Sequence, residues 1–164
     1  YQLKRVYAWL RPDEYPQDAM QQQNSIIAIG SGQLYGKGLN NDEVTSVKNG
    51  NFIAEAQTDF IFAVAGEETG FVGCCVLVVL EFLIALECLL VGRRAKLLSG
   101  TLICCGMAAQ IFFQTFINIS VATGLMPNTG ISLPFISSGG SSIVCLMVEI
   151  GLVLSVSNQI RLVD

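Results

Sequence analysis

The sequence contains no histidine, and only 13% of its 164 residues are charged. Histidine is the commonest general base and a frequent metal ligand, so its absence leaves acid–base chemistry to carboxylates and excludes a serine hydrolase triad. The net charge is −4 and no basic stripe is present, whereas nucleic-acid binding needs a concentrated positive surface. We therefore expect no nucleic-acid partner.

The six cysteines lack the spacing of a zinc site or of a disulfide framework. All of them fall inside apolar stretches, where a cysteine acts as a small packing residue. We expect that role for them and predict no metal site; they are Cys74, Cys75, Cys88, Cys104, Cys105 and Cys145.

Apolar residues make up 52% of the chain, too many for an ordinary soluble domain. We predict an all-α integral membrane protein with three transmembrane helices at about residues 61–91, 97–122 and 141–157. In the first, the apolar part from Phe71 to Val91 would extend roughly 32 Å as a helix, enough to cross the hydrocarbon core. An outer loop is expected at about residues 123–140.

Residues 1–60 are polar and are predicted to lie outside the membrane, with a short amphipathic helix at Gln17 to Ala28. The basic residues Arg93, Arg94 and Lys96 crowd the link between the first two spans, and Arg161 follows the third. Because basic residues favour the cytoplasmic side, the N-terminal region and the loop at 123–140 are assigned to the outer face. The C-terminus is then cytoplasmic.

Three glutamates lie within the apolar parts of the predicted spans, counted from Phe71 onward in the first, and these parts contain neither Lys nor Arg. An intramembrane carboxylate needs a partner, water or a proton. Glu87 is expected to lean toward Arg93 or Arg94, whereas Glu81 and Glu149 are expected to face a bundle interior completed by further helices. Together with the lack of an initiator methionine, this predicts that the chain continues a longer polytopic protein.

A glycine-rich segment at residues 30–38 fails the P-loop test, because Gly36 and Lys37 are followed by Gly38 instead of Ser or Thr. It is interpreted as a turn-rich surface loop, and Lys37 remains a candidate for a diphosphate.

Thr58 and Asp59 immediately precede the first apolar helix. They either cap its free backbone amides or form part of a site at the membrane surface. The loop from Gly124 to Ser142 also has two interpretations. It is a plain outer loop with Ser141 or Ser142 capping the third span, or it folds back into the protein around its Leu-Pro-Phe stretch.

Several long motifs in this order resemble the SEDS family of bacterial wall polymerases, which includes RodA, FtsW and SpoVE. The motifs lie at residues 28–32, 36–38, 52–63, 67–70, 116–119 and 133–142. Four positions depart from the family pattern, namely Gln33, Ala54, Ser132 and Ser138. The stretch around Asp59 is intact.

The resemblance implies a ten-span protein, of which this chain would be the large outer loop after span seven and the last three spans. It further implies a peptidoglycan polymerase that joins lipid II units at the outer face of the bacterial cytoplasmic membrane, with Asp59 as general base. Glu55 and Thr58 would shape the same pocket, and Lys37, Ser137 and Ser141 are further substrate-binding candidates.

The expected partners are lipid II, a class B penicillin-binding protein and other membrane proteins of elongation or division. A requirement for a divalent cation is left open. Two other functions stay open beside polymerisation, a lipid II flippase or other transporter and a non-catalytic scaffold. The chain alone is expected to be inactive.

Overall fold

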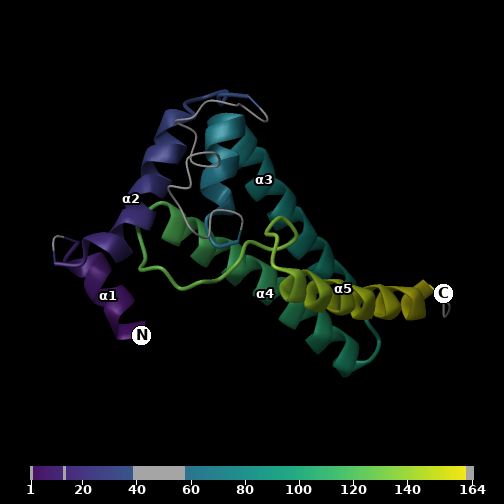
Figure 1. Cartoon of the computed structure of the whole chain (residues 1–164). Helices are drawn as coiled ribbons and strands as arrows, with labels where there is room; N and C mark the ends of the chain where they lie inside the picture. Colours follow the sequence, from purple (N-terminus) through teal and green to yellow (C-terminus); the bar gives the residue numbers. More distant parts are fainter. Residues whose placement is uncertain (1, 13, 39–57, 162–164) are drawn as a thin grey trace.

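The computed structural model describes residues 2–12, 14–38 and 58–161, which form helices joined by turns and loops and contain no strand (Figure 1). The helices are α1 (Gln2–Leu10), α2 (Pro16–Ser31), α3 (Ile61–Arg94), α4 (Leu98–Ala122) and α5 (Gly140–Arg161). The predicted all-α class is confirmed over these ranges. The amphipathic helix expected at 17–28 is the longer α2, which begins at Pro16 because proline suits a first helical turn.

Helices α3, α4 and α5 are each long and apolar enough to cross a membrane. Large side chains such as Phe71, Phe82 and Phe113 are exposed on them. Such a surface would be unfavourable in water and is ordinary in lipid, which accounts for the integral membrane class. The third of these helices, α5, already begins at Gly140. Ser141 and Ser142 therefore lie within its first turn, and the capping role considered for them is wrong.

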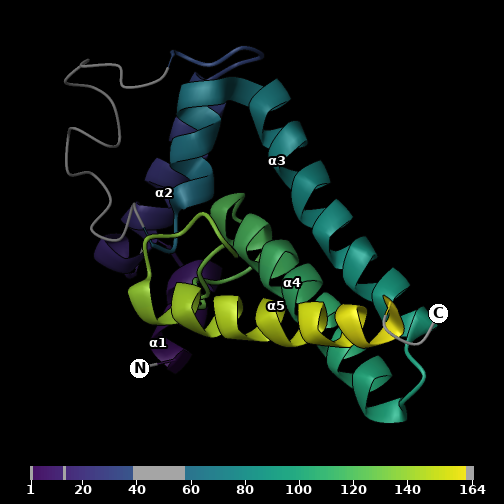
Figure 2. The same cartoon turned by 90° about the vertical axis from the view of Figure 1, so that its right-hand side faces the viewer.

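Helix α3 is bent at Gly70, where the backbone is non-helical with φ 68° and ψ −168°. Figure 2 shows the chain rising beside α2 as far as the bend and then descending toward α4. A positive φ is open to glycine at little cost, so the sequence permits the bend at this residue. The long apolar part from Phe71 onward is the second, longer limb.

The glycine-rich segment after α2 supplies hydrogen-bond partners to the backbone around this bend. A bend removes partners from helical N–H and C=O groups, and such groups must be paired in apolar surroundings. Four backbone bonds do this: Lys37 N to Glu67 O (2.9 Å), Gly38 N to Glu68 O (3.1 Å), Phe71 N to Gln33 O (2.9 Å) and Val72 N to Leu34 O (3.2 Å). Residues 32–38 therefore hold the bend of α3 through backbone hydrogen bonds, and we call this segment the clasp.

The clasp depends on an approach that only glycine allows. A Cβ added to Gly32 would lie 1.9 Å from the carbonyl oxygen of Gly66, and one added to Gly36 would lie 2.2 Å from that of Glu68. Both distances are far below van der Waals contact, and both opposing atoms belong to backbone. Packing against the α3 backbone thus explains the glycines at positions 32 and 36.

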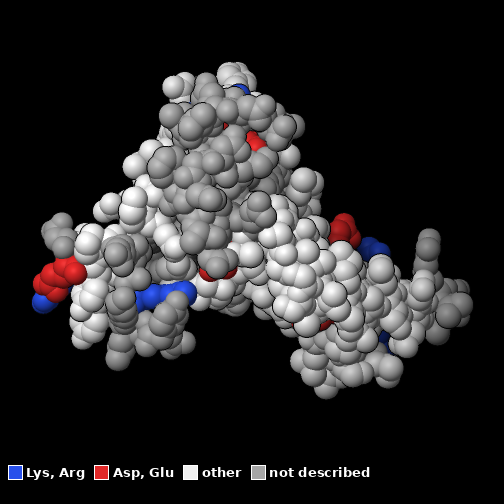
Figure 3. Space-filling view, viewed as in Figure 1, with Lys and Arg blue, Asp and Glu red and all other residues white. Residues whose placement is uncertain are grey.

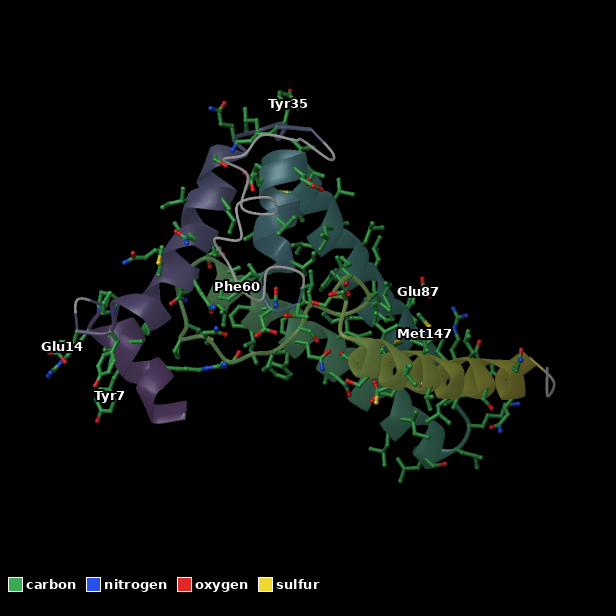
Figure 4. The ribbon with its side chains drawn as sticks, in the orientation of Figure 1. Tyr7, Glu14, Tyr35, Phe60, Glu87 and Met147 are labelled. Atoms are coloured by element: carbon green, nitrogen blue, oxygen red, sulfur yellow. The ribbon has the colours of Figure 1, made fainter. Side chains whose placement is uncertain are left out.

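Small residues let α3 and α4 approach closely below the bend, as is common between membrane helices. Their shared core includes Ala85, Cys88, Cys104 and Ala108, and α5 adds Leu146 and Val153. A second cluster places fully buried Phe60 against α2 and the end of α4, through Ala28, Ala63 and Val121 (Figure 4). Cys74, Cys88 and Cys104 pack as expected, whereas Cys75, Cys105 and Cys145 are exposed.

Two of the intramembrane acids lie against neighbouring helices of this chain. Glu81 is 4% exposed and lines a cavity of about 120 Å³ between α3 and α4 with Thr115. Glu149 on α5 accepts a hydrogen bond of 2.9 Å from Gln110 on α4. Glu81 was expected to face helices outside this chain, but α3 and α4 alone bury it.

The clasp provides a matched test of packing. We expect Gly32→Ala to destabilise the protein because its methyl group would displace the Gly66 carbonyl. Gly30→Ala, in the last turn of α2, should be neutral or slightly stabilising, because nothing lies within 4 Å of the added carbon. The melting temperatures of the two variants in detergent measure this difference, and equal values would contradict the clasp.

Candidate active site

Asp59 lies immediately before α3, where that helix meets α2, the end of α4 and the outer loop, residues 123–139. Phe60 occupies the N-cap position of α3 and makes no side-chain cap hydrogen bond. The helix-cap interpretation of Thr58 and Asp59 is therefore wrong. Both residues are half-buried.

Two buried side chains hold the main chain of Thr58 and Asp59. Asn118 of α4 donates one hydrogen bond to the Asp59 carbonyl and another to the Ile131 carbonyl, each of 2.8 Å. The Ser137 hydroxyl of the outer loop donates to the Thr58 carbonyl. Asn118 is 1% exposed and Ser137 is 2% exposed, so the side chains that donate these three bonds are buried. The backbone that carries Asp59 is thereby fixed to α4 and to the outer loop.

The outer loop folds back into the protein, as one of the two interpretations of the sequence proposed. Its Leu133 and Pro134 are buried. Side chains of α1 and α2 donate to backbone carbonyls at the end of α4 and in the loop: Trp9 to Gly124 (2.9 Å), Gln22 to Val121 (2.9 Å) and Met126 (2.7 Å), and Ser25 to Ala122 (2.9 Å). The last carbonyls of α4, which have no partner within the helix, are satisfied in this way.

A basic residue that the sequence did not suggest stands beside Asp59. A Cβ added to Gly130 would lie 3.2 Å from Nη1 of Arg5 and 3.5 Å from Oδ2 of Asp59, so the guanidinium and the carboxylate flank the same glycine. Nη1 of Arg5 also donates to the Asn128 carbonyl at 3.4 Å. In Figure 3, basic and acidic side chains lie close together where α1 meets the middle of the molecule.

The remaining candidates lie elsewhere. Nζ of Lys37 lies 3.0 Å from Oε1 of Glu67, whose side chain is 2% exposed. Glu67 is about 9 Å farther along α3 than Ile61, at the usual rise of a helix. Ser141 is exposed at the start of α5, while its neighbour Ser142 contacts Ser132 at 3.2 Å. Glu55 lies outside the described residues.

The structure thus brings together Thr58, Asp59 and Ser137 and adds Arg5 and Asn118. Within the described ranges no group of three or more His, Cys, Asp or Glu side chains is placed to hold a metal ion. What the arrangement offers is a carboxylate on an anchored backbone, at the point where a polar loop meets an apolar helix. Such a group can accept a proton from a substrate hydroxyl.

Residues 1–162 match the family model described as "Cell cycle protein" for FtsW, RodA and SpoVE. Two curated relatives, each named "Probable peptidoglycan glycosyltransferase FtsW", come from Buchnera aphidicola subsp. Schizaphis graminum and from Pasteurella multocida. The first is 35% identical over 167 residues, covering 99% of this chain and 46% of the relative. The second is 38% identical over 166 residues, covering 99% of this chain and 41% of the relative.

A solved structure described as "Structural coordination of polymerization and crosslinking by a peptidoglycan synthase complex" has the same fold. It matches with a TM-score of 0.70 and 32% sequence identity over 96% of this chain and 42% of that one. The chain therefore spans less than half the length of the proteins that it resembles.

The anchor formed by Asn118 can be tested separately from chemistry. Asn118→Ala should lower the free energy of unfolding by about 2 kcal/mol, because two backbone carbonyls lose their donor in a buried place. Ser120→Ala is the control, since the Ser120 hydroxyl bonds only within α4, to Phe116. Thermal unfolding in detergent measures both, and an Asn118 variant as stable as the Ser120 variant would contradict the anchor.

Proposed function

The chain belongs to the FtsW, RodA and SpoVE family of cell cycle proteins, and from this we propose that it forms part of a peptidoglycan glycosyltransferase. The observation that carries the proposal is the placement of Asp59. Its carbonyl accepts a hydrogen bond from Asn118, and the carbonyl of the preceding Thr58 accepts one from Ser137, at the start of a long apolar helix. The names of the curated relatives support the same activity.

In the proposed reaction, a sugar hydroxyl of the acceptor attacks the anomeric carbon of a lipid-diphosphate-linked donor. A new carbon–oxygen bond forms as the bond from the anomeric carbon to the diphosphate breaks, and the electron pair of that bond leaves with the diphosphate. Asp59 takes the proton of the attacking hydroxyl as general base. No histidine exists in the chain to take this role.

Thr58 is proposed to shape the pocket around Asp59, together with Glu55. Ser137 would act on this pocket through the Thr58 carbonyl, because its hydroxyl is buried and bonded there. Lys37 and Ser141 are less suited to contact the substrate at the reaction centre. The first is paired with Glu67, and the second is exposed at the start of another helix.

The protein is a multi-pass membrane protein, and we assign it to the bacterial cytoplasmic membrane with lipid II as donor and acceptor. The basic link between α3 and α4 supports a cytoplasmic position for that end of both helices, in which case Asp59 and the outer loop would face outward. The matching peptidoglycan synthase complex couples polymerisation to crosslinking. A class B penicillin-binding protein and other membrane proteins of wall synthesis are therefore the proposed partners.

A lipid flippase is the alternative that the intramembrane acids favour. Glu81 is buried between α3 and α4, and Glu149 is bonded to Gln110 across α4 and α5. Transport pathways often depend on such acids, whereas a polymerase of the kind proposed depends on Asp59. A flippase should therefore be impaired more by substitution of Glu81 or Glu149, and a polymerase more by substitution of Asp59.

The test measures glycan strands made from lipid II by the full-length protein that contains this chain. Asp59→Asn and Asp59→Ala should lower polymerisation by about 10²-fold or more, because the general base is lost, while lipid II binding is retained. Glu81→Gln and Glu149→Gln serve as controls and should keep most of the activity. Undiminished synthesis by both Asp59 variants would overturn the proposal. Loss of lipid transport in the glutamate variants would favour the flippase.

A further inference from the structure

The guanidinium of Arg5 and the carboxylate of Asp59 approach the same point of the outer loop. The carbon that an alanine would add at Gly130 lies within 4 Å of both Nη1 of Arg5 and Oδ2 of Asp59. Gly130 has a φ of +73°, so glycine also suits the backbone there. The loop therefore passes the two charged groups without a side chain of its own between them.

Helix α1 is held in a way that fixes Arg5 at this place. Trp9, one turn farther along α1, donates to the Gly124 carbonyl at 2.9 Å. Arg5 itself donates to the Asn128 carbonyl at 3.4 Å. The two bonds attach the same face of α1 to both ends of a short stretch of the outer loop. A guanidinium has five N–H donors, so the bond to Asn128 leaves capacity for a carboxylate.

The elements around Asp59 carry few other charges. The last two turns of α4, the whole outer loop and the first turn of α3 contain no Asp, Glu, Lys or Arg. In α3 the first charged residues are Glu67 and Glu68, and the former is paired with Lys37. Helix α2 contributes only Asp18. Among the described side chains near the site, Arg5 thus supplies positive charge to a carboxylate in mostly neutral surroundings.

We propose that Arg5 is a positioning residue for the glycosyl transfer, holding the Asp59 carboxylate ionised and directed toward the outer loop at Gly130. The inference rests on the proposed function of Asp59 as general base. A half-buried carboxylate beside apolar helices is otherwise driven toward its neutral form, in which it cannot accept a proton. A guanidinium a few ångströms away favours the charged form, and its planar fork also orients the carboxylate.

The same pairing has a consequence for the reaction step. When Asp59 takes the proton of the acceptor hydroxyl, its negative charge is neutralised while charge develops on the departing diphosphate. The guanidinium then remains as a positive charge next to the reacting groups, so the net charge around Arg5 changes little. Arg5 acts through Asp59, and its loss should therefore affect turnover more than donor binding.

Lipid II polymerisation by the full-length protein tests this with four variants. Arg5→Ala should lower kcat by about 10-fold to 10²-fold, with little change in KM. This loss should not exceed the loss of activity in the Asp59 variants, which lack the base. Arg5→Lys should recover part of kcat, because it keeps the charge but not the planar fork. Arg11→Ala is the matched control, since this second arginine of the same region is exposed and lies 3.2 Å from Glu14. It should behave as wild type.

Asp59→Asn in the same assay separates the two proposals. If Asp59→Asn is inactive and Arg5→Ala has a normal kcat, the role of Arg5 is overturned and the polymerase proposal stands. If Asp59→Asn is fully active, the polymerase proposal fails first. A raised KM with unchanged kcat in Arg5→Ala would assign Arg5 to donor binding and overturn the positioning role. Where Arg5→Ala does not fold, as judged by thermal unfolding, a kcat for Arg5→Lys equal to wild type overturns the proposal.

Discussion

The requirement that every backbone polar group near the membrane have a partner determines the structure around Asp59. A bend in α3, the end of α4 and an inward-folding loop all leave N–H and C=O groups without helical partners. The clasp, residues 32–38, satisfies those at the bend through four backbone bonds. Polar side chains satisfy most of the others. Many polar side chains of this region therefore form hydrogen bonds with the backbone, and only a few remain that could take part in catalysis.

This constraint explains how a loop residue can be held as firmly as one in a helix. The Asp59 carbonyl and the Ile131 carbonyl share one donor, Asn118, which joins the start of α3 to the outer loop through α4. Asn118 is almost fully buried, and a hydrogen bond in such a low-dielectric place is stronger than one in water. The catalytic geometry proposed here is a by-product of pairing the backbone. A general base needs such a fixed position to meet the proton that it accepts.

Sequence reasoning succeeded where the signal was local and failed where it was not. Apolar length gave the three long helices to within a few residues, because hydrocarbon thickness fixes their size. The motif around Asp59 predicted the start of the first apolar helix, although the N-cap of that helix is Phe60. The bend at Gly70 was missed, since one glycine among many carries no mark of a positive φ. Arg5 was missed for another reason. It lies far from Asp59 in the sequence, and only the docking of α1 on the outer loop brings the two together.

Two basic residues, Lys37 and Arg5, show how placement in the fold decides a role that composition leaves open. Lys37 belongs to the clasp and lies beside a carboxylate that is almost fully buried, Glu67. Removing either charge alone would leave the other in apolar surroundings, so this pair is tied to the fold around the bend. Arg5 lies instead beside a half-buried carboxylate, Asp59, next to Gly130 of the outer loop. The compact ammonium suits a closed pair, and the planar guanidinium suits a carboxylate that must stay oriented while its charge changes. The sequence singled out Lys37 as the basic residue of interest, whereas the structure places Arg5 beside the proposed base and Lys37 in the clasp.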